Sequence, residues 1–307
     1  MKKDLRIIFM GTPEFAVPSL QILVENGYKV VAVITAPDKP AGRGLKLRTS
    51  PVKDYAVSQG IPVLQPTNLK SPEFNEELKS YQANLQVVVA FRMLPEVVWA
   101  MPELGTFNLH ASLLPQYRGA APINWAIING ETETGATTFF LKHEIDTGDI
   151  IMQEKEPVHA ADTAGTLYKR LMHKGAGLVL KSVQQIEKGE VQLKNQPQDG
   201  EIKKAPKIFK EDCQIDFTRP ASEVYNFIRG LSPYPAAWTT LNGKTCKIYE
   251  AEIPAEQGTR PEDQAVFTDN KTFLHLKAAD GYIAVKSLQM EGKKRMGTEE
   301  FLRGNKF

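Results

Sequence analysis

Residues 5–35 read LRIIFMGTPEFAVPSLQILVENGYKVVAVIT, and this stretch decides the fold. Its two ends, Leu5–Met10 and Tyr28–Thr35, are short runs rich in Ile and Val, which is typical of strands buried on both faces. Between them, about residues 14–26 have a helical pattern that stops at Gly27. A strand–helix–strand order predicts parallel strands and helices on both faces of the sheet.

The same alternation continues through the first two-thirds of the chain. Further strands are predicted at 85–90, 105–109, 136–141 and 150–158, and further helices at 52–59, 73–81 and about 162–187. We therefore expect an α/β domain over residues 1–188, built on a doubly wound, mostly parallel sheet.

The texture of the sequence changes after residue 188. Segment 189–206 is polar and contains Pro197, Gly200 and Pro206, so we interpret it as a linker. Residues 207–307 contain one helical stretch, 221–229, followed by short strand-like runs that turn residues separate. This pattern predicts a small β-barrel domain with a helix.

Composition limits the class of protein. The chain has 307 residues, of which 42% are hydrophobic and 24% charged, and these are ordinary globular values. Two cysteines make neither a disulfide framework nor a four-ligand zinc set, so we expect free thiols in a reducing compartment. We find no signal peptide and no apolar run long enough to span a membrane, and we therefore expect a cytoplasmic protein.

Residues 105–122 read GTFNLHASLLPQYRGAAP and carry the most informative polar side chains. On a strand, Asn108 and His110 are two residues apart and project from the same face. The ends of such strands are where open α/β sheets bind ligands. A second segment, HEIDTGD at 143–149, places Asp146 in a loop of small residues.

These three side chains suit one kind of chemistry. A carboxylate close to His110 favours the charged imidazolium, and an amide beside it supplies a second donor. Asn108, His110 and Asp146 could therefore stabilise an oxyanion and relay protons. Spacing alone leaves a purely structural role open, and it does not show that Asp146 reaches His110.

Four motifs resemble the signature of the folate-dependent formyltransferases. They are Asn108-Leu-His110, Ser112-Leu-Leu-Pro115, Arg118-Gly-Ala-Ala-Pro122 and Asp146-Thr-Gly-Asp149, and residues 9–15 resemble the family's first strand and turn. The resemblance spans nearly the whole chain and is closest to members that formylate methionyl initiator tRNA. It implies a Rossmann-like formyltransferase fold, with a C-terminal OB-like β-barrel over 207–307 that binds tRNA.

The resemblance also implies roles for individual residues. Asn108, His110 and Asp146 would be catalytic: the amine attacks the formyl carbon of 10-formyltetrahydrofolate directly, without a metal. Arg92 departs from the small residue expected at its position, and Leu113 and Leu114 could equally be core residues. The implied folate-binding set is Phe91, Arg92, Met93, Leu94, Ser112, Leu113, Leu114 and Pro115.

Segment 38–53 is the best indication of an RNA partner. Its five basic residues, Lys39, Arg43, Lys46, Arg48 and Lys53, outweigh Asp38 and give a local charge of +4. A solvated charged loop is the alternative, but the resemblance implies that this loop enters the tRNA acceptor stem, with Arg43 the most important residue. The implied acceptor-binding set is Gly11, Thr12, Pro13, Lys39, Arg43, Lys46, Arg48, Lys207 and Lys210.

Residues 203–307 carry 17 basic and 14 acidic residues, which suits contacts to an RNA backbone. Tyr225, Tyr234 and Trp238 could stack on bases, although we expect them mainly in the core.

Three other functions remain open to the sequence. The acceptor could be an amino-sugar nucleotide, or water in a hydrolase, because such relatives share the same trio. A dinucleotide-binding oxidoreductase is disfavoured because residues 11–15 lack the G-x-G-x-x-G spacing. A non-catalytic RNA-binding protein would leave the trio unused. We expect a monomer.

Overall fold

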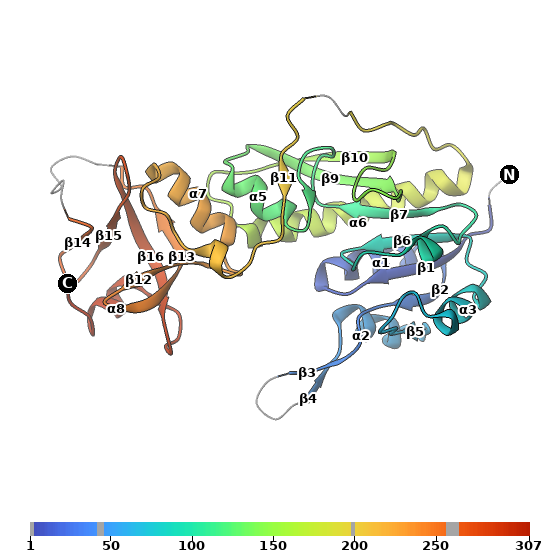
Figure 1. Cartoon of the computed structure of the whole chain (residues 1–307), viewed down its shortest axis with the longest axis horizontal. Coiled ribbons are helices and arrows are strands. Elements are labelled where there is room, and N and C mark those ends of the chain that lie inside the picture. The colour runs from blue at the N-terminus through green and yellow to red at the C-terminus, as the bar shows by residue number, and fades with distance from the viewer. Residues whose placement is uncertain (1–2, 42–45, 198–199, 256–263) are drawn as a thin grey trace. The chain divides into compact units, whose positions relative to one another are not determined.

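A seven-stranded sheet lies at the centre of the N-terminal part of the computed structural model (Figure 1), in the order β10-β9-β7-β6-β1-β2-β5. Its parallel strands are β1 (Arg6–Gly11), β2 (Lys29–Ile34), β5 (Val63–Leu64), β6 (Leu85–Val89) and β7 (Thr106–His110). Strand β9 (Glu133–Phe140) runs antiparallel to β7, and β10 (Ile150–Pro157) forms the edge. The predicted mostly parallel sheet is confirmed.

Helices connect these strands, and two of them begin at a serine followed by proline. Ser50 and Ser71 accept hydrogen bonds from the backbone N–H groups of Lys53 and Phe74, which caps α2 and α3. Each of these helices therefore starts one residue before the predicted position. The helices are η1 (Glu14–Ala16), α1 (Val17–Glu25), α2 (Pro51–Ser58), α3 (Pro72–Ser80), α4 (Glu96–Trp99) and α6 (Ala164–Lys188).

The long helix α6 covers one face of strand β7. A Cβ atom added to Gly175 would lie 2.7 Å from Leu109 Cδ2, so the helix backbone approaches this strand closely. Successive strand residues face opposite ways, and Leu109 lies between Asn108 and His110 in sequence. The face that carries Asn108 and His110 is therefore the one turned away from α6.

Segment 38–53, predicted as a basic loop, contains two strands and the start of a helix (Figure 1). Strands β3 (Lys39–Ala41) and β4 (Lys46–Arg48) pair as an antiparallel hairpin, and α2 starts directly afterwards. The structure describes residues 3–41, 46–197, 200–255 and 264–307, so Arg43 lies outside the described residues.

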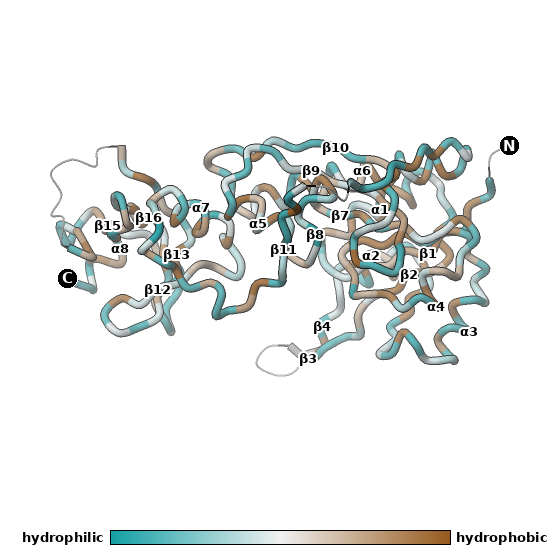
Figure 2. The backbone as a smooth tube through the Cα atoms, turned by 45° about the horizontal axis from the view of Figure 1, so that its top comes forward, coloured by the Kyte–Doolittle hydropathy of each residue, from teal (hydrophilic) through white to brown (hydrophobic). Residues whose placement is uncertain are grey.

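An antiparallel sheet dominates the C-terminal part, in the order β12-β13-β16-β15-β14. Among the described residues its end strands are not paired with each other, so the sheet is a curled half-barrel rather than a closed barrel. Cys246 and Ile248 of β13 are buried and alternate with more exposed neighbours. Figure 2 shows hydrophobic and hydrophilic stretches of the backbone alternating in this part of the chain. Its elements are α7 (Ala221–Leu231), β12 (Ala237–Leu241), β13 (Lys244–Glu252), β14 (Val266–Thr268), β15 (Leu274–Lys277), β16 (Tyr282–Met290), β17 (Met296–Gly297) and α8 (Thr298–Leu302).

The chain divides into two compact units, and the division does not follow a single point in the sequence. One unit comprises Met1–Arg118, Gly135–Glu156 and Tyr168–Lys203, and the other comprises Gly119–Thr134, Pro157–Leu167 and Lys204–Phe307. In the second unit, α5 (Pro122–Ile128) packs on α7, because Gly230 lies against Ile128. Three short elements complete the set: β8 (Arg118–Gly119), β11 (Lys204–Ala205) and η2 (Glu211–Cys213). None of the helices described is both long and apolar enough to cross a bilayer.

Candidate active site

The imidazole of His110 and the carboxylate of Asp146 lie together at the end of β7. His110 Nδ1 is 3.9 Å from Asp146 Oδ2, and only 7% and 11% of the two side chains are exposed. This distance is too long for a direct hydrogen bond but within the 4 Å at which the two groups can form an ion pair. The structure thus brings together two side chains that are 36 residues apart in sequence.

The other imidazole nitrogen has a partner that fixes the tautomer. His110 Nε2 is 2.8 Å from the carbonyl oxygen of Tyr117. A carbonyl oxygen can only accept a hydrogen bond, so Nε2 carries a proton and donates. Nδ1 is therefore the nitrogen left on the side of Asp146, where it can hold a second proton or release it.

Asn108 presents a buried amide oxygen with no partner. Its Oδ1 makes no hydrogen bond to any part of the chain that the structure describes. Buried amides are nearly always satisfied in folded proteins, and an exception needs an explanation. Asn108 is two residues from His110 and on the same face of β7, so its amide is well placed to bind a ligand together with the imidazole.

The loop that carries Asp146 is held in an unusual conformation. Asp146 has a φ of +56°, in the left-handed region that disfavours residues with a side chain. A Cβ atom added to Gly148 would lie 1.6 Å from the carbonyl oxygen of Phe140, so only glycine fits there. This close approach presses the loop against the end of β9.

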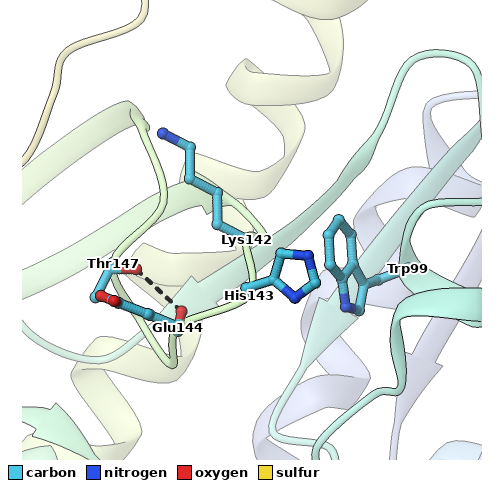
Figure 3. A pocket seen from close by; sticks show the side chains of 5 residues that line it. All are labelled: Trp99, Lys142, His143, Glu144 and Thr147. Carbon is cyan, nitrogen blue, oxygen red and sulfur yellow. Dashed lines mark hydrogen bonds between the residues drawn. The ribbon is translucent and has the colours of Figure 1, made fainter.

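A pocket of about 370 Å³ opens beside this loop (Figure 3). The ring of His143 meets Trp99 edge-on, with the ring centroids 5.6 Å apart, and its Nε2 lies 3.2 Å from Glu96 Oε1. Thr147 Oγ1 donates a hydrogen bond to the carbonyl oxygen of Glu144. The lining residues are Trp99, Lys142, His143, Glu144 and Thr147.

None of these lining residues was predicted as a folate contact. Trp99 and Lys142 give no motif signal, and residues 143, 144 and 147 belong to the HEIDTGD segment, of which only Asp146 is predicted to act in the site. The volume nevertheless lies within the range of small-ligand pockets, and an aromatic wall beside polar groups suits a flat heterocycle.

The predicted folate-binding residues have mixed environments. Leu94 and Leu114 are buried at 8% and 3% exposure, whereas Met93 is 73% exposed. The guanidinium of Arg92 donates to the backbone carbonyls of Pro66 and Thr67 and does not line the pocket described above.

The 112–115 turn is anchored by polar contacts that sequence reasoning missed. Gln153 Nε2 donates to the carbonyl oxygen of Leu114 at 2.8 Å, and Thr137 Oγ1 donates to that of Ser112 at 2.6 Å. Ser112 Oγ in turn donates to the carbonyl oxygen of Gln116 at 2.6 Å. Glutamine and threonine carry no signal for such long-range contacts.

Among the predicted RNA-binding residues, Lys39 and Arg48 of the hairpin are exposed. Lys207 and Lys210 are also exposed, and Lys207 Nζ lies 5.0 Å from the ring centroid of Phe209. Tyr234 is 82% exposed, so the expectation that it packs in the core is wrong. Tyr225 and Trp238 do pack against the C-terminal core.

Lys53 is engaged within the protein. Its Nζ lies 2.5 Å from Asp38 Oδ2 and 2.8 Å from Gln65 Oε1, and Gln65 Nε2 donates to Asp38 Oδ1 at 2.8 Å. The hydrogen bonds from Lys53 and then Gln65 hold the pKa of Asp38 below its ordinary value. These contacts tie together the two ends of segment 38–53.

Two family patterns match the sequence. The one described as "Formyl transferase" matches residues 5–183, and "Formyl transferase, C-terminal domain" matches residues 207–306. A methionyl-tRNA formyltransferase of Bacteroides fragilis is 57% identical over 314 residues, covering 99% of this chain and 96% of the relative. One from Flavobacterium johnsoniae is 53% identical over 309 residues, covering 99% and 98%.

Solved structures share the fold at low sequence identity. An N-formyltransferase from Helicobacter canadensis, solved with folinic acid and dTDP-3-aminofucose, superposes with a TM-score of 0.68 at 23% identity, covering 95% of this chain and 100% of that one. HypX from Aquifex aeolicus, solved with tetrahydrofolic acid, gives a TM-score of 0.63 at 18% identity. This chain is 98% covered and spans about half (47%) of HypX.

Proposed function

The chain belongs to the formyl transferase family in both of its parts, and on this premise we propose that it transfers a formyl group from 10-formyltetrahydrofolate to the α-amino group of methionyl initiator tRNA. Relatives named for this activity are more than half identical to it over almost its full length. The structural observation that carries the proposal is the unpaired amide oxygen of Asn108 beside the His110–Asp146 pair.

We place the folate co-substrate in the pocket beside Asp146. Its volume of about 370 Å³ and its tryptophan wall suit a flat ring system, and Thr147 on its lining directly follows Asp146. The co-substrate supplies a formyl group on N10 when it is bound. We propose that Phe91, Arg92, Met93, Leu94, Ser112, Leu113, Leu114 and Pro115 contribute further contacts.

Asn108 and His110 bind the oxygen of the reacting carbonyl. As the amine adds to the formyl carbon, negative charge grows on this oxygen. Asn108 would donate through its Nδ2 group, and a proton on His110 Nδ1 would supply the one ring donor that Tyr117 does not occupy. Two such donors preorganised in a partly buried site commonly provide much of the rate enhancement of acyl transfer.

Asp146 relays protons. Its carboxylate lies 3.9 Å from Nδ1 of His110, on the side of the ring that Tyr117 does not occupy. Nδ1 and the carboxylate are close enough for one water molecule to hydrogen-bond to both groups. Through such a water, Asp146 receives the proton that the attacking amine loses and returns it to the departing nitrogen.

The basic hairpin provides a surface for the RNA acceptor. Lys39 and Arg48 are exposed on β3 and β4, and phosphate contacts from such residues are typical of RNA-binding loops. Arg43 and Lys46 belong to the same segment, Gly11, Thr12 and Pro13 would lie near the methionyl end, and Lys207 and Lys210 would contact the tRNA backbone. We further infer a cytoplasmic monomer with a catalytic domain at 1–188, a linker at 189–206 and a tRNA-binding domain at 207–307.

A direct assay tests this function. Purified protein is incubated with 10-formyltetrahydrofolate and methionyl initiator tRNA, and N-formylmethionyl-tRNA is measured. Parallel reactions contain methionyl elongator tRNA or a dTDP-linked amino sugar, the acceptor type of the Helicobacter canadensis enzyme's bound ligand. Rapid formylation of the initiator tRNA alone supports the proposal, whereas formylation of the amino sugar alone overturns it.

A further inference from the structure

In the polar segment predicted as a linker, one buried side chain hydrogen-bonds to the loop that carries Asp146. Gln196 is only 7% exposed, although its neighbours in sequence are mostly exposed. Its Nε2 donates to two backbone carbonyl oxygens, those of Asp146 and Gly148, each at 2.8 Å. Both N–H donors of the amide are therefore used on the loop that carries Asp146.

The oxygen of the same amide is also engaged. Gln196 Oε1 accepts hydrogen bonds from Arg118, at 3.1 Å from Nε and 2.6 Å from Nη2. Arg118 directly follows Tyr117, whose carbonyl oxygen accepts the hydrogen bond from His110 Nε2. One buried amide thus joins the turn that orients His110 to the loop that carries its carboxylate partner.

The Asp146 loop needs such a partner. Asp146 has a φ of +56°, and a residue with a side chain keeps this conformation only where its surroundings impose it. Gly148 presses the loop against Phe140 on one side, and Gln196 binds its carbonyl groups on another. Together these contacts determine where the Asp146 carboxylate lies relative to His110.

A neighbouring part of the same segment hydrogen-bonds to the turn that contains Gln116 and Tyr117. Gln116 Nε2 donates to the carbonyl oxygen of Glu201 at 3.1 Å, and the N–H of Lys203 donates to Gln116 Oε1 at 2.9 Å. The N–H of Tyr117 donates to the carbonyl oxygen of Lys203 at 2.6 Å. The described residues after α6 therefore bind both the loop that carries Asp146 and the turn whose carbonyl accepts a hydrogen bond from His110.

We propose that Gln196 is a positioning residue for formyl transfer, acting by fixing the Asp146 loop and, through Arg118, the turn that binds His110. It touches neither substrate nor reacting atoms in this scheme. The inference rests on the proposed function, since it assigns Gln196 to the same reaction. A positioning role differs from a purely stabilising role, because replacing the Gln196 amide should then lower kcat more than it lowers the stability of the fold.

The test compares two changes at Gln196 with one matched change elsewhere. Gln196→Met removes all four hydrogen bonds, whereas Gln196→Glu keeps acceptors for Arg118 but loses both donors to the loop. Asn75→Leu is the control: Asn75 Nδ2 likewise donates to two backbone carbonyls, of Leu69 and Ser71, but on α3 away from the site. Each variant is measured for kcat, for KM of both substrates and for its melting midpoint.

We expect both Gln196 variants to lose kcat by about 10- to 100-fold, the effect of a small misplacement of catalytic groups. Asn75→Leu should lower the melting midpoint to a similar degree while its kcat stays within about twofold of the wild-type value. Wild-type kcat in Gln196→Glu or Gln196→Met overturns the proposal. So does a loss of kcat in Asn75→Leu that matches its loss of stability.

A crystal structure of Gln196→Glu separates this inference from the proposed function. A positioning role predicts a longer distance between Asp146 Oδ2 and His110 Nδ1 than the 3.9 Å seen here, whichever acceptor the wild-type protein uses. An unmoved Asp146 loop contradicts the inference even if formylation is confirmed. Failure of wild-type protein to formylate tRNA contradicts the function and leaves this structural test standing.

Discussion

The carbonyl oxygen of Tyr117 lies 2.8 Å from His110 Nε2 and thereby decides which ring nitrogen faces the reacting groups. Tyr117 itself has a φ of +60°, so this carbonyl is directed by a turn in the left-handed region. A histidine whose far nitrogen is held in this way offers only Nδ1 to a substrate.

The first prediction concerns this tautomer. In protein with ¹⁵N-labelled histidine, the neutral ring of His110 should show protonated Nε2 and unprotonated Nδ1. His110→Ala identifies the signal by its disappearance. Spectra in which Nδ1 carries the proton of the neutral ring would contradict the hydrogen bond to Tyr117.

The second prediction concerns Asn108. Asn108→Ala should lower kcat by about 100- to 1,000-fold, the usual effect of removing one oxyanion donor. It should cost little stability, because the buried Oδ1 has no hydrogen bond to the described chain to lose.

Thr106→Val, on the same strand, is the control for Asn108→Ala. Thr106 Oγ1 lies 2.6 Å from Trp99 O, to which it donates, and 2.9 Å from Gln86 Oε1, and losing these buried contacts should cost about 1–3 kcal/mol of unfolding free energy. Its kcat should fall far less than that of Asn108→Ala. Equal losses of turnover would argue against a special role for the amide.

The third prediction concerns Gly148. A methyl group there would lie 1.6 Å from the carbonyl oxygen of Phe140, so Gly148→Ala must displace the Asp146 loop. We expect kcat to fall by about 10- to 100-fold or more. Gly177→Ala is the matched control, since nothing lies within 4 Å of its added methyl group and alanine in a helix is favoured by about 0.5–1 kcal/mol.

The fourth prediction concerns the base of the basic hairpin. If Asp38 and Lys53 position the hairpin, Asp38→Lys or Lys53→Asp alone should raise KM for tRNA by about twofold to fivefold. The double exchange should restore much of the loss, because Gln65 can turn its amide to match. If Lys53 instead contacts RNA directly, the double variant stays impaired.

The same pair has a defined dependence on pH. The pKa of Asp38 is lowered in the folded protein, so its stabilising effect is complete above the ordinary value of 3.8 and is lost as pH falls through the lower folded value. Between about pH 6 and 9 the exchange should therefore have a constant effect on KM. A KM ratio that changes with pH in this range would implicate another group.

The fifth prediction concerns the two thiols. Cys213 and Cys246 are 1% and 0% exposed, and burial raises the pKa of Cys213 and takes that of Cys246 to about 12. Thiols are neutral below their pKa, so in native protein at about pH 8 neither should react with an aromatic disulfide reagent. Both should react in denaturant, and Cys213→Ser should then release one equivalent fewer. Rapid labelling of native protein would contradict the burial.

Local patterns predicted most of the fold, and distant contacts explain what they missed. The sequence predicts strand β6 to within one residue, because a short Val-rich run between polar segments is typical of a buried strand. Strand β12, which follows two prolines and includes Trp238, has no such pattern and is stabilised by pairing with β13. The β3–β4 hairpin was missed for the same reason.

The candidate site was predictable only in part. Asn108 and His110 could be placed on one strand face from their spacing, and family resemblance supplied Asp146. Gln196 could not be predicted in this way, because nothing in the sequence around a glutamine in a polar segment indicates which distant loop it binds. Trp99 was missed because an isolated aromatic residue usually indicates core packing.

The hydrogen bonds of Gln196 also bear on when the chain becomes competent during its synthesis. A nascent polypeptide that has reached Lys188 already contains every strand of the large sheet and all three side chains at its reactive end. It still lacks the amide that secures one of them. A chain that has emerged from the exit tunnel only as far as Lys188 should therefore display the sheet with its reactive loop unsecured, and this loop should become secured once residue 196 has emerged as well.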